Sequence, residues 1–294
     1  MNGHLRSCTW SMRSLRRASR AFQVELYKMF AQRSTYAGFV IIALVIGLIV
    51  YGTWRHGTHM DELARLGSDR FIVAGKALTA PFVLQFVLPS VMEVLMALLV
   101  AAVGGGLVAA EVRSGTLRTL LMRPVARGEL LLAKMGAGWI YALFLSVFAG
   151  LTAAALGYVV FGPGDLVSVI TGRLVIFSHE EALVRLGMAY GFAALGRCVI
   201  ATVAVMLSCL FDNALTAGAV TVASLLCFRI LGEIPYFDSW KPYFLTTHLD
   251  VYLDPLKADL DWNDILRHLG GLASYAAGAL AVAAAAFCRR DITS

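Results

Sequence analysis

Two stretches of the chain, Tyr36–Trp54 and Met135–Phe161, are apolar and contain no charged residue. A helix rises 1.5 Å per residue, so about 20 apolar residues are enough to cross roughly 30 Å of membrane hydrocarbon. A strand of a membrane barrel would instead alternate apolar and polar residues over about ten positions. The two stretches therefore predict membrane-spanning helices.

Four more segments are long and apolar enough to span a membrane, three of them with one charged residue each: Pro81–Ala110, Leu186–Phe211, Ala214–Leu231 and Leu269–Cys288. Composition agrees, because 59% of the 294 residues are hydrophobic and only 15% are charged, against about 25% charged in soluble domains. The predicted fold class is all-α, a polytopic membrane protein with six transmembrane helices. We expect a basic arm in 1–35 and a six-helix membrane domain in 36–292.

The end of the N-terminal arm has helical periodicity. Phe22, Leu26, Met29 and Phe30 recur at helical spacing, with Glu25 and Lys28 off this apolar side. Such a pattern favours an amphipathic helix over 22–33 that lies in the membrane interface before the first span. A solvated basic arm is the alternative.

Lysine and arginine predict how the spans are oriented. Seven precede the first span, five lie between the second and third spans and two follow the last, against eight in the loops of the opposite side. Because cytoplasmic loops are enriched in these residues, we expect both termini in the cytoplasm.

The cytoplasmic connection EVRSGTLRTLLMRPVARGELLLAK, residues 111–134, has a specific local pattern. Gly115 permits a sharp change of direction, and Thr116 can cap a new helix. Leu117, Leu120 and Leu121 share one helical face, and Pro124 ends the helix. The segment therefore predicts a short helix, apolar on one side, that suits docking into a groove of another protein. An ordinary basic loop is the alternative.

This pattern resembles the signature of the type-2 (ABC-2) permeases of ATP-binding-cassette transporters. The similar positions in the connection are Glu111, Gly115, Thr116, Leu117, Leu120, Leu121, Arg123, Pro124, Val125, Arg127 and Lys134. Three further stretches are similar to the family: Glu25, Leu26 and Lys28 to its elbow helix, Pro235–Tyr236 with Pro242–His248 to the stretch between the last two spans, and Phe287–Ile292 to its closing motif.

The resemblance implies a membrane subunit without catalytic residues that exports a substrate, usually as two six-span halves of identical or homologous chains. Each half docks a separate ATP-binding subunit, two copies in all, through the elbow helix and a short coupling helix. Those partners would bind ATP and Mg. The membrane subunit would lie in the plasma membrane of a bacterium, its inner membrane. The residues implied in coupling are Glu111, Gly115, Thr116, Leu117, Arg123, Pro124 and Arg127, with Glu25, Leu26 and Lys28 in the elbow.

The residues themselves agree that any ATP-driven engine is a separate polypeptide. No GxxxxGK[ST] motif, which would cradle phosphates, occurs in the sequence. The longest segments outside the spans are about 35 residues, too short for a nucleotide-binding domain. We expect no nucleic-acid partner.

Ionisable groups at membrane depth are costly and indicate function or specific packing. Glu93 and Arg197 lie near the middle of the second and fourth spans. They are predicted either to form a buried ion pair between packed helices or to line a translocation path. The second possibility favours an alternative function, a self-sufficient carrier or channel. Pro89 and Gly104–Gly106 in the second span permit a kink and a close helix approach; the alternative is that they are tolerated background.

No catalytic constellation or metal site is predicted. His56 and His59 with Asp61 have a spacing compatible with metal binding, but such pairs are common by chance in polar loops. The five cysteines are scattered without a CxxC pair, which is typical of buried small side chains. The acidic residues of 250–264 are interpreted as a solvated face.

Overall fold

The structure is a computed structural model that describes residues 12–66, 78–115, 126–168 and 175–289, with side chains from residue 19 to residue 55 in the first range. Six of its helices are long and apolar enough to cross a membrane: Arg33–Arg55, Ala80–Arg113, Arg127–Val160, His179–Leu210, Ala214–Glu233 and Trp262–Arg289. The all-α, six-span prediction is thereby confirmed. Large side chains such as Val40, Leu44 and Leu48 are about two-thirds exposed on the first span, as expected where lipid is the solvent.

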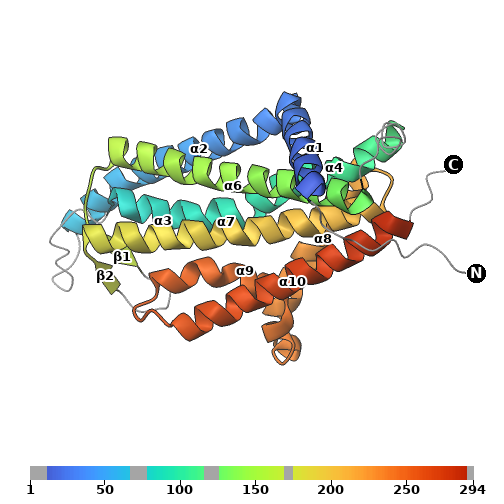
Figure 1. The fold of residues 1–294 in the computed structure, drawn as a ribbon. Coiled ribbons are helices and arrows are strands. Elements are labelled where there is room, and N and C mark those ends of the chain that lie inside the picture. The colour runs from blue at the N-terminus through green and yellow to red at the C-terminus, as the bar shows by residue number, and fades with distance from the viewer. Residues whose placement is uncertain (1–11, 67–77, 116–125, 169–174, 290–294) are drawn as a thin grey trace, which may run out of the picture.

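The helices run along one long axis (Figure 1). Helix α2 (Arg33–Leu66) is followed by α3 (Ala80–Val91), a π-helical segment (Met92–Met96) and α4 (Ala97–Arg113), which together form the second span. Helices α6 (Arg127–Val160), α7 (His179–Leu210), α8 (Ala214–Glu233) and α10 (Trp262–Arg289) complete the spans. Helix α7 lies at the centre, in contact with α4, α6, α8 and α10, and is the most buried of the spans.

Helix α1 (Met12–Ala31) lies across the end of the bundle, against α6, instead of along its axis (Figure 1). Met29 of the apolar pattern is 2% exposed, whereas Tyr27 is 78% exposed. Glu25, which the sequence places off the apolar pattern, is also buried, at 3% exposed. The lysine partners described below account for its burial.

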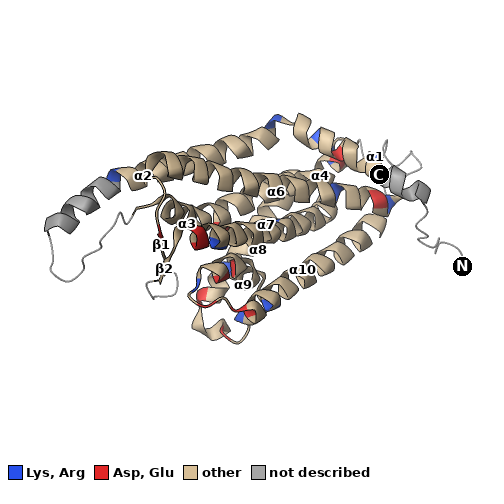
Figure 2. Ribbon diagram, turned by 60° about the vertical axis from the view of Figure 1, so that its left-hand side comes forward, with Lys and Arg blue, Asp and Glu red and all other residues tan. Residues whose placement is uncertain are grey.

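Short elements connect the spans before α7 and between α8 and α10. Strands β1 (Leu166–Ser168) and β2 (Val175–Phe177) form an antiparallel pair before α7. Between α8 and α10 the chain forms short helical turns at Pro235–Phe237 and Lys241–Tyr243, then α9 (Leu245–Leu249) and the turn Asp250–Leu256. The last turn packs against α7 and α10. Charged residues gather near the helix ends and around α9, whereas the long helical shafts are mostly uncharged (Figure 2).

Several helices begin earlier than the hydropathy pattern predicts. Helix α1 begins at Met12 instead of residue 22, α6 at Arg127 instead of 135, α7 at His179 instead of 186 and α10 at Trp262 instead of 269. The reason is that polar first turns continue the same backbone hydrogen bonds as the apolar shaft, although they lower its hydropathy. Lys134 is consequently a residue of helix α6 and not of a loop.

The second span bends and packs closely where proline and glycine predict it. The π-helical segment follows Pro89, which has no N–H to donate. A Cβ added to Gly104 would lie 2.8 Å from the Ala204 Cβ, and one added to Gly105 would lie 2.6 Å from the Gly218 nitrogen. Gly104 therefore lets α4 approach α7 closely, and Gly105 lets the backbones of α4 and α8 touch.

Candidate functional site

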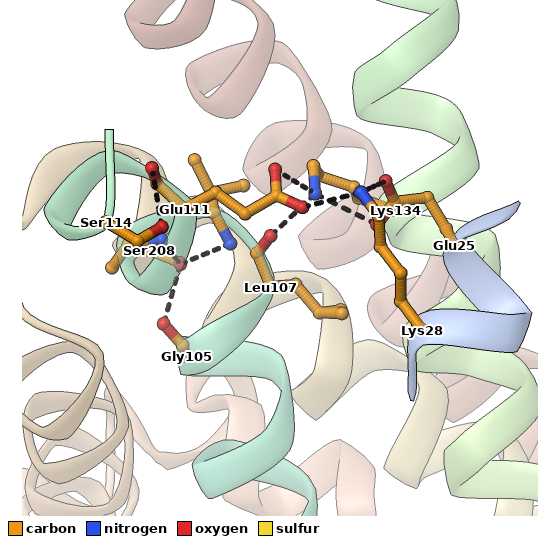
Figure 3. Close-up of polar contacts among 10 residues, drawn as sticks. Glu25, Lys28, Gly105, Leu107, Glu111, Ser114, Lys134 and Ser208 are labelled. Carbon is orange, nitrogen blue, oxygen red and sulfur yellow. Dashed lines mark hydrogen bonds and ion pairs between the residues drawn. The ribbon is translucent and has the colours of Figure 1, made fainter. Parts of the chain in front are cut away.

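A closed network of four charges joins three helices at the end of the bundle where α4 ends and α6 begins (Figure 3). Lys134 Nζ lies 2.9 Å from Glu25 Oε2 and 2.7 Å from Glu111 Oε2, and Lys28 Nζ lies 3.2 Å from Glu25 Oε1 and 3.1 Å from Glu111 Oε1. Each carboxylate thus contacts both ammonium groups through different oxygens. We call Glu25, Lys28, Glu111 and Lys134 the charge network.

Lys134 is the most buried member of the charge network. Its side chain has no exposed area, and its ammonium also donates to the Leu107 carbonyl at 2.8 Å. The ammonium thus donates two hydrogen bonds, to Glu25 Oε2 and to the Leu107 carbonyl, and forms an ion pair with Glu111 Oε2. Removing one member of a buried ion pair typically costs about 3–5 kcal/mol, because the remaining charge is left buried without a partner. The charge network therefore ties α1, α4 and α6 into one unit.

Lys28 closes the charge network on the side open to solvent, with a side chain 38% exposed. Burial lowers the pKa of Lys28, but the hydrogen bond to Glu111 and the charges of Glu25 and Glu111 outweigh it, so the pKa lies above its usual value. The network contains two cations and two anions and is neutral overall.

Apolar packing of α1 on α6 sets the register of the charge network. The ring of Phe22 lies so close to Gly136 that an added Cβ there would meet it at 2.8 Å. Glu25 follows Phe22 by three residues and Lys134 precedes Gly136 by two, so the contact brings the carboxylate and the ammonium together. The small residue in α6 and the aromatic ring in α1 thus position the two charges.

Just before Glu111, a side chain of α7 enters the hydrogen-bond ladder of α4. The Ser208 hydroxyl donates to the Gly105 carbonyl at 2.6 Å and accepts from the amides of Val108 and Ala109 at 3.1 and 2.8 Å (Figure 3). A side chain inserted between turns is a recognised cause of helix bending. Ser208 was not singled out in the sequence, because a serine in an apolar span gives no signal of its own.

The connection leaves α4 through a turn that requires glycine. Gly115 has a φ of 71°, a left-handed conformation that residues with a Cβ rarely adopt. Four of the residues implied in coupling, Thr116, Leu117, Arg123 and Pro124, lie outside the described residues. Arg127 begins α6, and its guanidinium donates to the Cys288 carbonyl at 3.0 Å near the end of α10.

Leu26 of the elbow is partly buried and packs against the core.

Glu93 and Arg197 lie in a second polar cluster, away from the charge network. The expected Glu93–Arg197 ion pair is wrong. Glu93 pairs with Arg229, and Arg229 Nη1 also lies 2.8 Å from Asp250 Oδ1. Arg197 is 2% exposed and donates to the backbone carbonyls of Met92 and Ala193.

Both Glu93 and Arg197 nevertheless line one small cavity of about 60 Å³, together with Arg229 and Asp250. Burial raises the pKa of Asp250, and the hydrogen bond from Arg229 opposes that rise. The interpretation of the acidic segment as solvated is wrong for two of its members, because Asp250 is bound to Arg229 and Asp254 is 6% exposed. A sequence pattern does not reveal such pairs, which join residues 136 and 21 positions apart.

Comparison with known proteins gives a match to the part of the chain that holds the charge network. The profile of the family described as ABC-2 family transporter protein matches residues 21–239, most of the chain, and its match includes the whole charge network. The "Uncharacterized protein YhcI" of Bacillus subtilis (strain 168) is 26% identical over 168 residues, 55% of this chain, and the chain spans about half (53%) of that relative's length. This multi-pass membrane protein therefore belongs to the ABC-2 family of transporter proteins.

Proposed function

We propose that the chain is the membrane-spanning subunit of an ATP-driven exporter, and that a separate ATP-binding subunit docks where α4 ends and α6 begins. The observation that carries this proposal is the charge network. It fixes both ends of the 114–126 connection, through Glu111 and Lys134, to helix α1 through Glu25 and Lys28. A force applied by a partner to the connection would therefore reach three helices at once.

The proposal assigns coupling to Glu111, Gly115, Thr116, Leu117, Arg123, Pro124 and Arg127, and elbow contacts to Glu25, Leu26 and Lys28. None of these residues is proposed to be catalytic. ATP and Mg bind to the partner, of which two copies serve a pair of six-span chains, identical or homologous. The proposed location is the bacterial inner membrane with both termini in the cytoplasm, in agreement with the excess of lysine and arginine on that side.

The direct test is intact-complex mass spectrometry after purification in mild detergent from the native host. We expect two copies of this chain, or one copy and a homologue, together with two ATPase subunits that carry a P-loop. A chain that purifies alone, and stays alone when candidate ATPases are added, would overturn the proposal. It would favour a self-sufficient carrier, for which Glu93 and Arg197 are the residues to change.

Coupling variants test the docking assignment within an assembled complex. Gly115→Leu forces a side chain into a left-handed turn, and Arg123→Glu reverses a charge in the connection. We expect transport to fall at least tenfold in each, with membrane insertion unchanged. Gly128→Leu is the matched control, because nothing lies within 4 Å of a Cβ added to Gly128. Unchanged transport in both coupling variants would show that the connection does not couple the two subunits.

A further inference from the structure

Two histidines face each other across the junction of α9 and α10, at the end of the bundle opposite the charge network. His248 Nδ1 lies 3.3 Å from His268 Nδ1. His248 is 8% exposed, whereas the His268 side chain is 23% exposed, so the pair is open on one side. Neither histidine belongs to the charge network or to the second polar cluster, which contains Glu93, Arg197, Arg229 and Asp250.

The other ring nitrogen of each histidine has an oxygen acceptor nearby. The His248 ring donates a hydrogen bond to the Pro242 carbonyl, and since Nδ1 faces His268, Nε2 is the nitrogen left for it. His268 Nε2 lies 4.0 Å from Asp254 Oδ2. That oxygen is buried and has no hydrogen-bond partner among the described residues, while Asp254 Oδ1 lies 2.6 Å from Lys257 Nζ.

The hydrogen positions of the pair follow from its tautomers, and these two acceptors favour a proton on Nε2 of each ring. Each imidazole that carries its proton on Nε2, toward the Pro242 carbonyl or the Asp254 carboxylate, points an Nδ1 lone pair at the other ring. Two lone pairs at 3.3 Å repel each other unless a cation lies between them. Histidines that bind a metal almost always donate their other N–H to a carboxylate or a backbone carbonyl. His268 and His248 have one acceptor of each kind.

We propose that His248 and His268 bind a divalent transition-metal ion of the zinc and copper class through their Nδ1 atoms. Nitrogens about 2.0–2.1 Å from a tetrahedral zinc ion lie about 3.3 Å apart, which equals the distance between the two Nδ1 atoms. Imidazole is a preferred ligand of this class of metal. No group of three or more His, Cys, Asp and Glu side chains suited to a metal occurs within the described residues, so water or a soluble ligand completes the coordination.

Glycine in α10 gives the His248 ring its place. A Cβ added to Gly271 would lie 2.4–2.5 Å from three atoms of the ring, whereas nothing lies within 4 Å of a Cβ added to the neighbouring Gly270. The bound ion would therefore link the segment between the last two spans to α10. This inference is independent of the ATP-driven function proposed above.

The test is a zinc titration of the detergent-solubilised full chain, without a histidine tag, by isothermal titration calorimetry near pH 7.5. Residues His56 and His59 are replaced by Ala in every sample, so that they contribute no binding. We expect about one zinc ion per chain, a loss of at least tenfold in affinity in His248→Asn and in His268→Asn, and a loss of about 10–100-fold in Asp254→Asn, as is typical when an outer hydrogen-bond partner is removed. His179→Asn is the control, because both nitrogens of His179 already have partners, Tyr158 and the Gly164 carbonyl.

A second pair of variants keeps the test decisive if an Asn variant unfolds. Gly271→Ala should weaken zinc binding and Gly270→Ala should not. Copper(II) bound to the same protein should give an electron paramagnetic resonance spectrum with hyperfine splitting from two nitrogens. The proposal would be overturned if the His248→Asn and His268→Asn variants bound zinc as tightly as the parent protein, or if the parent protein showed no saturable zinc binding. In the second case, a melting temperature that depends on pH but not on zinc would show that a proton occupies the pair.

Discussion

At the scale of single residues, Lys134 is the side chain on which the most contacts at the candidate site converge. Replacing it with Met keeps the length of the side chain but leaves Glu25 and Glu111 facing each other without the buried ammonium. We expect the free energy of unfolding to fall by about 3–5 kcal/mol. Equilibrium unfolding in mixed micelles measures this change.

Two controls separate the charge network from a general effect of losing a lysine. Lys241→Met removes an exposed lysine of the segment between α8 and α10, and such surface changes usually stay within about 0.5 kcal/mol. The triple variant Glu25→Gln, Glu111→Gln and Lys134→Met removes the buried ammonium together with both of its carboxylate partners and should regain part of the stability. A Lys134→Met protein as stable as the Lys241→Met protein would contradict the role given to the charge network.

The sequence indicated which residues of the charge network are important, but it did not indicate which of them form ion pairs with one another. The elbow and connection motifs drew attention to Glu25, Lys28, Glu111 and Lys134, but their spacing gives no reason for them to meet. Glu25 lies outside the apolar pattern of its helix, so the sequence contains no sign that it is buried. Burial of a carboxylate depends on a cation supplied from elsewhere in the fold, and Lys134 lies 109 residues away.

At the scale of secondary-structure elements, the α4–α8 contact depends on the absence of side chains. Gly105→Ala places a methyl group 2.6 Å from the Gly218 nitrogen, which is backbone and cannot rotate away. We expect the two helices to separate and the melting temperature to fall by at least several degrees, in line with the about 1–3 kcal/mol typical of overpacking. Gly106→Ala is the control, since nothing lies within 4 Å of its added Cβ. Equal melting temperatures would show that the contact relaxes without cost.

The apolar parts of the elements were predictable and their ends were not. Uncharged shafts such as Tyr36–Trp54 have only one way to satisfy their backbone in lipid, which is a helix. The polar first turns of α6, α7 and α10 belong to the same helices but resemble loops in composition. The short turns between α8 and α10 carry no periodic pattern, so the placement of His248 and Asp250 could not be predicted.

At the scale of the whole molecule, the proposed orientation puts the two ends of the bundle on opposite sides of the membrane. Gly128 is exposed in the first turn of α6, and Ser239 is exposed in the segment between α8 and α10. In a variant without its native cysteines, we expect Ser239→Cys to react with a membrane-impermeant maleimide in cells whose outer membrane has been made permeable and whose inner membrane is intact. Gly128→Cys should react only after the membrane is opened. The reverse pattern would overturn the cytoplasmic assignment of the termini.

The bend at Met92–Met96 has a mechanical consequence for the charge network. Between Ala97 and Glu111, α4 is a lever about 22 Å long at 1.5 Å per residue, and a tilt of roughly 10° about the bend moves its tip by about 4 Å. The ion pairs at that tip are only 2.7–3.2 Å long. Such a tilt must therefore either move α1 and α6 together with α4 or break the charge network. A large tilt of the second span that keeps the charge network intact is thus a concerted movement of three helices.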